Sequence, residues 1–172
     1  MTNNFDACLA HVLKSEGGFV NHPADPGGMT NLGVTKRVWE EYTKRQASEM
    51  EMRSLTPDMV KPLYRDMYWD RVKADDLPVG VDLCVFDLAV NSGVYRAAVT
   101  LQRVLGAKDD GIIGPKTLAA AGNADPEQLI KDYCKRRRMF IRGLATYVTF
   151  GKGWENRINS VESDALAMLL KP

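Results

Sequence analysis

The stretch SEGGFVNHPADPGGMT (residues 15–30) places four glycines and two prolines directly after an amphipathic segment. The apolar residues of that segment, at positions 5, 8, 9, 12 and 13, recur at helical spacing and share one face. Gly17 and Gly18 end the helix, and the turn-forming residues up to position 35 predict a small, irregular β-hairpin. Glu16 is therefore expected in the last turn of a helix, next to a rigid hairpin.

Turn and capping signals divide the rest of the chain into further helices. Thr35 and Asp125 can each cap the start of a helix, and Pro57 follows Thr56 at a position typical of a first helical turn. The helix after Asp125 is expected to run to about Phe150, where GKGW breaks it before a last helix. The pattern predicts a mainly α fold of about seven or eight helices with one small β-hairpin.

Composition restricts the class of protein. The 172 residues suit one domain, with ordinary hydrophobic (45%) and charged (26%) fractions. The net charge of +1 and the absence of a nucleic-acid motif argue against nucleic acid as a partner, and we expect a monomer. Cys8, Cys84 and Cys134 are expected to be small buried residues on helices, because their number and spacing suit neither a disulfide framework nor a zinc site.

Targeting signals are the next feature of the sequence. The N-terminus lacks the basic segment and apolar stretch of a secretory signal peptide. No apolar run reaches the ~18 residues of a membrane span, so no stable membrane insertion is expected. We therefore expect a soluble chain made in the cytoplasm, and any action beyond it requires another route of release.

Glu16 is the leading candidate for catalysis. Val12 and Leu13 on the same helix face shield it in part from water, which suits a general acid. Asp25 follows nine residues later beside a proline, and Thr30 follows Asp25. A carboxyl at a helix end that faces a carboxylate and a hydroxyl from a hairpin is a workable glycosidase layout: one acid protonates the leaving oxygen and the opposite groups hold the attacking water.

Polar residues beside the hairpin are candidates for supporting roles. Asn21 and His22 flank it. Asn21 is a candidate for substrate binding, and His22 is expected to make a hydrogen bond within the hairpin. Neither His22 nor His11 has partners at metal-ligand spacing. We expect no metal and no cofactor.

Two long segments resemble a known family. EGGFVNHPADPGGMTNLGVT (16–35) resembles the signature of the glycoside hydrolase family 108 lysozymes, which are N-acetylmuramidases of phage and bacteria. VDLCVFDLAVNSGVYRAAVTLQRVLGAKDDGIIGPKTL (81–118) resembles the predicted peptidoglycan half that accompanies it. The resemblance extends from about residue 5 to about residue 170. It implies a lysozyme-like, α-rich fold, peptidoglycan glycan strands as the partner and substrate, and Glu16 as the catalytic acid.

The expected organisation is a single lysozyme-like domain over residues 1–172. Residues 5–75 form a lobe with the catalytic glutamate and the hairpin, and residues 76–172 form a helical, peptidoglycan-binding-like lobe. Within the second lobe, LQRVLGAKDDGIIGPKTL (101–118) is similar to part of small peptidoglycan-binding modules, and we interpret it mainly as scaffold.

The spacing Glu-x8-Asp-x4-Thr is similar to the Glu-x8-Asp-x5-Thr triad of phage lysozymes, with one residue fewer before the threonine. This difference leaves two assignments open. Asp25 and Thr30 are the catalytic candidates beside Glu16, but Thr35 is a rival for the hydroxyl role and a candidate for substrate binding. Asp25 can alternatively shape the hairpin without touching the reacting atoms.

Four further residues are candidates for substrate binding. Asp87 and Asn91 are four residues apart and share a helix face; they form either a buried hydrogen-bonded pair or, at Asn91, a contact with the sugar. Tyr64 and Trp69 belong either to the core or to the wall of a cleft where an aromatic ring stacks on a sugar.

Basic residues cluster late in the chain, at 135–138 and Arg142. They span more than one helical turn, so they cannot all share a face. Two interpretations are open: a solvated helix, or a patch that attracts the anionic envelope and weakens with salt.

The expected function is that of a bacteriolytic muramidase, which cleaves the β-1,4 bond between N-acetylmuramic acid and N-acetylglucosamine. The expected setting is that of a phage or prophage endolysin, acting in the periplasm or at the cell wall after release. The alternatives are a non-catalytic peptidoglycan-binding, secretion-activating protein and a chitinase.

Overall fold

The computed structural model describes residues 4–21 and 28–171. Helix α1 (Phe5–Glu16) buries the face that the spacing predicts, with buried residues Phe5, Cys8, Leu9 and Val12. It ends where Gly17 adopts a φ of 76°, a value that glycine tolerates because it has no Cβ. Glu16 is thereby fixed as the last residue of the helix.

A small antiparallel sheet follows α1. Its strands, in spatial order, are β1 (Val20–Asn21), β2 (Met29–Asn31) and β3 (Val34–Thr35). Leu32 and Gly33 join β2 to β3 with φ values of 51° and 76°, the pair of positive angles that a two-residue type I′ turn requires. The side-chain amide of Asn31 donates to the carbonyl of Met52 at 2.8 Å and connects the turn to the helical segment that contains Met52. The predicted β element is confirmed, with a third short strand.

Short helices surround the sheet. They are α2 (Lys36–Thr43), α3 (Glu49–Arg53), α4 (Pro57–Tyr64), a π-helical turn (Arg65–Trp69) and a 3-10 turn (Ala74–Asp76). Thr35, Ser48 and Thr56 each accept a backbone N–H in the first turn of α2, α3 and α4, a contact that stabilises a helix by about 1 kcal/mol. The cap expected at Thr35 is therefore confirmed.

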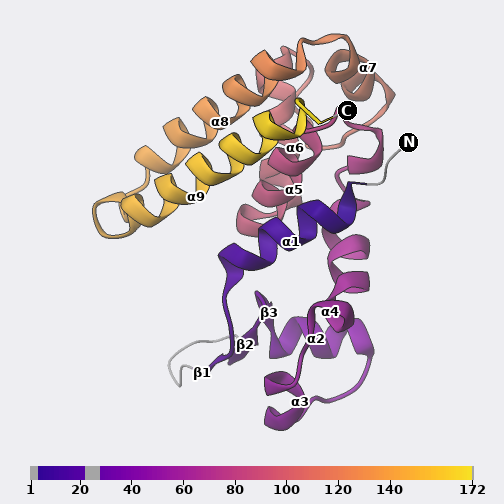
Figure 1. Cartoon of the computed structure of the whole chain (residues 1–172), viewed down its shortest axis with the longest axis vertical. Coiled ribbons are helices and arrows are strands. Elements are labelled where there is room, and N and C mark those ends of the chain that lie inside the picture. The colour runs from indigo at the N-terminus through magenta and orange to yellow at the C-terminus, as the bar shows by residue number, and fades with distance from the viewer. Residues whose placement is uncertain (1–3, 22–27, 172) are drawn as a thin grey trace.

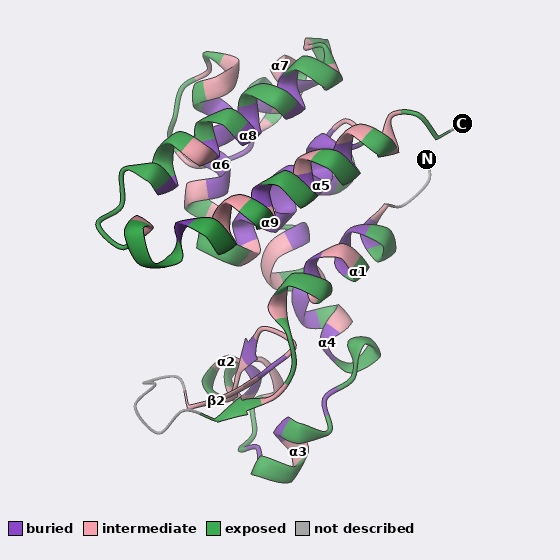
Figure 2. Cartoon of the chain, turned by 60° about the vertical axis from the view of Figure 1, so that its left-hand side comes forward, coloured by how far each residue is buried: buried purple, intermediate pink, exposed green. Residues whose placement is uncertain are grey.

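Longer helices form the other part of the molecule. They are α5 (Val81–Ser92), α6 (Val94–Leu105), α7 (Pro115–Asn123), α8 (Pro126–Arg142) and α9 (Tyr147–Met168). α5 packs against α1, α6, α8 and α9, and all of its residues from Val81 to Ala89 are buried (Figure 2). The most apolar segment of the chain is thus its central helix, as expected of a helix that is hydrophobic on every side.

Aromatic rings connect α1, the π-helical turn and α5. Phe5, Trp69 and Phe86 meet edge to face, with centroids 5.2–6.0 Å apart, and Tyr64 joins Phe86 at 6.4 Å. Each such pair contributes about 0.5–1.5 kcal/mol beyond the burial of its area. The cluster fixes α1 against α5, and Figure 1 shows the end of α1 that carries Glu16 between the sheet and the long helices.

The cysteines follow the prediction. Cys8, Cys84 and Cys134 lie on α1, α5 and α8, and all three are buried and free. Burial raises the pKa of the Cys8 thiol far above its usual value, so this thiol stays protonated and packs as a small apolar group.

The segment similar to peptidoglycan-binding modules is held together by Gln102. Its side-chain amide donates to Asp110 at 2.9 Å and to the carbonyl of Ile112 at 3.0 Å, and its oxygen accepts from the amide of Gly111 at 2.9 Å. Gln102 is 1% exposed. A buried glutamine that satisfies a turn in this way supports the interpretation of the segment as scaffold.

The boundary between the last two helices differs from the prediction. α8 ends at Arg142 with Gly143 as its cap, and α9 begins at Tyr147 and continues through GKGW. Gly151 is buried beneath Tyr147, and a Cβ at Gly151 would lie 2.5 Å from the ring. This close packing offsets the roughly 1 kcal/mol that a glycine costs within a helix. Within the described ranges, no helix is long and apolar enough to cross a membrane.

Candidate active site

Glu16 lies in a tight environment formed by the β2–β3 turn and α4. A Cβ built on Gly33 would lie 2.8 Å from Cγ of Glu16 and 2.5 Å from the hydroxyl of Tyr64. The Tyr64 hydroxyl donates to the carbonyl of Leu32 at 2.6 Å. The turn therefore approaches Glu16 closely because residue 33 has no side chain. Tyr64 supports that turn from below.

Arg157 on α9 is the polar partner of Glu16 among the described residues. Its Nη2 atom lies 2.8 Å from Oε1 of Glu16 and 3.0 Å from Oδ1 of Asp87. The Glu16 side chain keeps 19% of its exposure and that of Arg157 13%. One carboxyl oxygen of Glu16 is thus held by a guanidinium.

Asp87 on α5 fixes Arg157 from behind. Its carboxyl is fully buried and also lies 2.6 Å from Nη1 of Arg137, which is 3% exposed. Burial raises the pKa of Asp87, but the guanidinium groups of Arg137 and Arg157 outweigh it, and the net pKa lies below the usual value. Asp87 therefore remains ionised and holds two arginines.

The network joins two acidic and two basic side chains. Arg157 contacts the carboxyl groups of Glu16 and Asp87, and Arg137 contacts that of Asp87. Burial lowers the pKa of Arg157, but the charges of Asp87 and Glu16 more than reverse this and leave it raised. Such a network is costly to break, because the loss of one member leaves a buried charge without its partner.

Two tyrosines complete the apolar side of the site. Burial raises the pKa of Tyr64, and the negative charge of Glu16 adds to the rise; the same two causes raise the pKa of Tyr68. Both hydroxyls are therefore neutral near pH 7. Tyr64 is 1% exposed, so it supports the site from within the core and presents no ring face to a sugar.

The hydroxyl candidates lie opposite one another in the sheet. Thr30 on β2 pairs with Thr35 on β3 and with Val20 on β1, and directly opposed residues of antiparallel strands point to the same face. The Thr35 hydroxyl accepts from the amide of Val38 at 3.1 Å. Asn21 is exposed on β1. Asp25 and His22 lie outside the described residues.

Asn91 and Asp87 are joined through an arginine. Nη2 of Arg137 donates to Oδ1 of Asn91 at 3.1 Å, and Nη1 donates to Asp87. The sequence left open whether this pair is buried and hydrogen-bonded or whether Asn91 contacts the sugar. Asp87 has no exposed surface, so its role is to hold the arginines in place. Asn91 is exposed at the end of α5, where the contact with a sugar remains a prediction.

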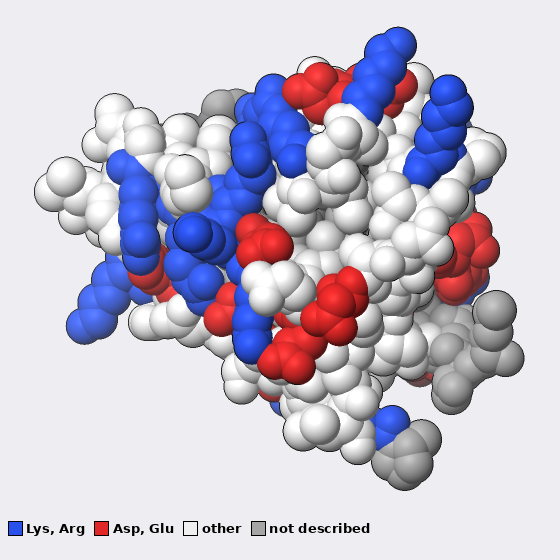
Figure 3. All heavy atoms as spheres, turned by 90° about the horizontal axis from the view of Figure 1, so that it is seen from above, with Lys and Arg blue, Asp and Glu red and all other residues white. Residues whose placement is uncertain are grey.

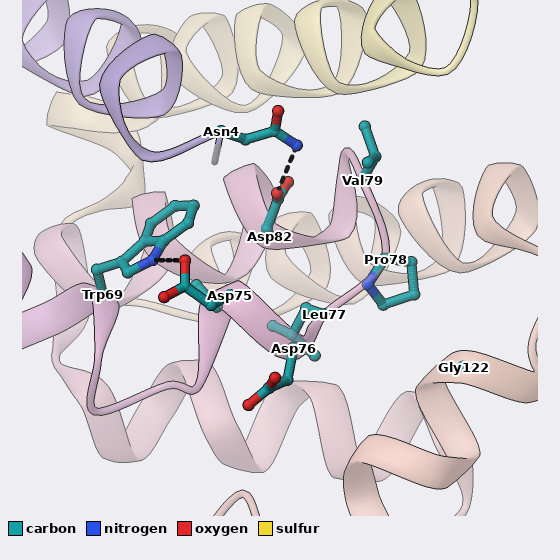
Figure 4. Close-up of a pocket in the computed structure, with 10 residues that line it drawn as sticks. Asn4, Trp69, Asp75, Asp76, Leu77, Pro78, Val79, Asp82 and Gly122 are labelled. Carbon is teal, nitrogen blue, oxygen red and sulfur yellow. Dashed lines mark hydrogen bonds between the residues drawn. The ribbon is translucent and has the colours of Figure 1, made fainter. Parts of the chain in front are cut away.

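The interpretation of Trp69 as part of a sugar-binding wall requires correction. The ring is 1% exposed, and its N–H donates to Asp75 at 2.8 Å. It borders a cavity of about 530 Å³ that also includes Asn4 and Asp82 (Figure 4). Asn4 immediately precedes α1, whereas Glu16 ends it, about 18 Å away along a helix of this length. Trp69 is a core residue because aromatic partners enclose it.

Sequence reasoning missed both arginines. Arg137 belongs to the basic run, but it also falls on the apolar stripe of α8, whose buried residues include Ile130, Tyr133, Cys134 and Ile141. Its helical phase was therefore a usable signal. Arg157 follows no comparable pattern, because its partners lie on α1 and α5.

Similarity to known proteins defines the class to which this protein belongs. A family model described as glycosyl hydrolase 108 matches residues 9–93, and a second, described as a predicted peptidoglycan domain, matches residues 96–159. The solved structure of Brucella abortus SagA is 43% identical over 96% of this chain and 95% of that chain, with a TM-score of 0.85. No curated protein matches the chain.

The fold is that of a lysozyme-like, mainly α protein, with a carboxyl at the end of the first helix beside a small sheet. The chain belongs to the glycosyl hydrolase 108 family, with its accompanying peptidoglycan domain. It is accordingly a hydrolase of a glycosidase family, and its second family match connects it with peptidoglycan.

Proposed function

We propose that this protein is a muramidase that cleaves the β-1,4 bond between N-acetylmuramic acid and N-acetylglucosamine, with Glu16 as the general acid. The observation that carries the proposal is the orientation of Glu16. Arg157 holds one of its oxygens at 2.8 Å, and Gly33 and Tyr64 pack against its side chain. A carboxyl fixed in this way can present its second oxygen to one substrate atom.

In the proposed reaction, Glu16 donates its proton to the bridging oxygen while the bond from C1 of the N-acetylmuramic acid to that oxygen breaks. The leaving sugar departs with a hydroxyl, and water adds to C1 from the hairpin side. The hydroxyl of Thr30, or that of its rival Thr35 on the same face of the sheet, is proposed to hold that water, and the carboxyl of Asp25 is proposed to accept the proton that the water loses. Arg157 is a positioning residue, since it acts through Glu16.

The proposed setting is the bacterial cell wall. An endolysin that a phage or prophage releases at host lysis would meet peptidoglycan from the inside. The family assignment supports peptidoglycan as substrate. The endolysin role further requires that a phage or prophage encodes the chain.

A substitution at Glu16 tests the assignment. Glu16→Gln keeps the shape of the side chain but removes the transferable proton, so we expect clearing of a purified cell-wall suspension to fall at least about 100-fold. Glu162→Gln is the matched control, because Glu162 also pairs with an arginine, Arg138, at 3.1 Å. A Glu16→Gln protein that folds normally and clears walls at the parental rate would contradict the proposal. Binding of walls without new reducing ends would favour a non-catalytic protein, and preference for chitin oligomers a chitinase.

A further inference from the structure

The turn between α8 and α9 projects from the body of the molecule (Figure 1), and it carries exposed apolar side chains. We call this set the tip patch: Met139, Phe140, Leu144, Val148 and Phe150. Val148 is 94% exposed, Met139 64% and Phe150 54%. Isolated exposed apolar residues are ordinary, but several on one projecting hairpin mark an interaction surface.

The same hairpin is strongly cationic. Residues 135–154 contain six Lys and Arg residues and no Asp or Glu, although the whole chain carries a net charge of only +1. Arg137 is used inside the protein, and Arg138 and Arg142 pair with Glu162 and Glu155.

Three cations of the hairpin remain available to a partner. Lys135, Arg136 and Lys152 are exposed, and no ion pair involves them within the described part of the chain. Figure 3 shows Lys and Arg side chains gathered toward the left-hand end, where the α8–α9 turn lies in Figure 1.

We propose that this tip docks on the anionic surface of a phospholipid bilayer, with the tip patch in the interfacial region and the cations against the headgroups. A surface that combines exposed aromatic and aliphatic side chains with basic residues fits this partner, because a bilayer offers an apolar phase and negative charge within a few ångströms of each other. An anionic wall polymer offers the charge but no apolar phase.

Docking through the tip leaves the active site free. Arg157 lies on the same helix α9, about two turns beyond Phe150, and it faces Glu16 on the body side. A molecule held by the tip therefore keeps Glu16 beside the membrane, where the innermost wall layers lie. The docking does not depend on the proposed muramidase activity, so either can fail alone.

Flotation of the full chain with unilamellar vesicles tests the proposal. The probes are vesicles of phosphatidylglycerol mixed with phosphatidylcholine, and vesicles of phosphatidylcholine alone. We expect binding to the anionic vesicles that weakens as salt rises, and at least about tenfold weaker binding to the neutral vesicles, because each basic residue near an anionic surface contributes about fivefold.

Two sets of substitutions separate the apolar and charged contributions. Val148→Ser with Phe150→Ser, and separately Lys135→Gln with Arg136→Gln and Lys152→Gln, are each expected to reduce vesicle binding about tenfold or more. The control for the apolar set is Met50→Ser with Ile112→Ser, two exposed residues elsewhere on the protein (78% and 72%). The control for the charged set is Lys108→Gln with Lys116→Gln and Lys171→Gln, which removes the same number of exposed cations elsewhere. Both controls are expected to bind as the parent does. Thermal unfolding checks that each variant folds.

Trp154 provides a second readout, since it stacks on Phe150 at 5.8 Å whereas Trp39 and Trp69 are buried. Its emission is expected to shift to shorter wavelength on anionic vesicles. Absence of vesicle binding, or binding that the tip-patch variant leaves unchanged, would overturn the proposal. Binding to purified anionic wall that depends on the cations and not on the tip patch would assign the surface to the wall polymer instead.

Discussion

Arg157 joins Glu16 to Asp87: one Nη2 atom lies 2.8 Å from the first carboxyl and 3.0 Å from the second. Glu16 and Asp87 fall within the segment that matches the glycosyl hydrolase 108 model, whereas Arg157 falls within the segment that matches the peptidoglycan domain. The second segment therefore contributes directly to the geometry of the candidate acid, and the site is complete only when both segments are present.

Replacement of Arg157 tests this contribution. Arg157→Gln leaves Glu16 without its orienting partner, so we expect kcat to fall about 10- to 100-fold, since a displacement of about 1 Å has that effect on a catalytic group. Because Arg157 acts through Glu16, KM is expected to change little. Initial rates of reducing-end formation on purified walls measure this. Arg138→Gln, which removes the ion pair that joins α8 to Glu162 on α9, serves as the control; equal losses in both variants would show a general effect on the hairpin.

Asp87→Asn is expected to destabilise the protein by about 3–5 kcal/mol at pH 7, because it leaves Arg137 buried without its counter-charge and removes one of the two carboxyl groups that pair with Arg157. Chemical denaturation measures the loss. Asp109→Asn removes an exposed pair with Arg103 and is expected to change stability little. A small change at Asp87 would mean that the arginines find other partners.

Asp87 also predicts a pH dependence. Because its pKa in the folded protein lies below the usual value, the ionised form stabilises the fold at pH values above the pKa of about 3.9 in the unfolded chain. That stabilisation is lost as the pH falls through the lower, folded-state pKa. The difference in unfolding free energy between the parent and Asp87→Asn should therefore shrink as the pH is lowered below about 4. A difference that stays constant down to strongly acid pH would refute this assignment.

Gly33→Ala tests the close approach of the β2–β3 turn to Glu16. The substitution forces a Cβ into a positive-φ position, which costs about 1–2 kcal/mol, and it also places that Cβ against Glu16 and Tyr64. Gly106→Ala is the matched control, with a φ of 68° and, among the described residues, no atom within 4 Å of the added carbon. We expect Gly33→Ala to lose more stability than Gly106→Ala and to lose activity as well. Equal losses would show that the contact is unimportant.

Tyr64→Phe removes the hydroxyl that donates to Leu32 at 2.6 Å and keeps the ring in the core. We expect a loss of about 1 kcal/mol in stability, as is typical of one hydrogen bond, and a partial loss of activity because the turn beside Glu16 is less firmly held. Urea unfolding and wall-clearing rates measure the two effects. Activity at the parental level, with stability reduced, would confine Tyr64 to a structural role.

The features that could be predicted from the sequence are local ones. The apolar stripe of α1, its end at Gly17 and the cap at Thr35 depend on side chains within about one helical turn of each other, so neighbouring residues specify them. Glu16 at the helix end follows from the same information. These elements are sufficient to predict the class of fold and to place the leading catalytic candidate at a helix end.

The features that escaped prediction depend on contacts between distant segments. Arg157 meets its partners only when α9 packs on α1 and α5. For Trp69, the choice between core and cleft wall depends on rings from two other elements. The start of α9 at Tyr147 depends on the ring that covers Gly151. Periodicity reports the face of a helix and not the element that covers it.

Mass spectrometry of a digested sacculus tests the central claim most directly. After borohydride reduction, the muramidase proposed here leaves fragments that end in reduced N-acetylmuramic acid, and the Glu16→Gln protein, shown to be folded, leaves none above background. Fragments that end in reduced N-acetylglucosamine, or products that are unchanged by the substitution at Glu16, would contradict the account.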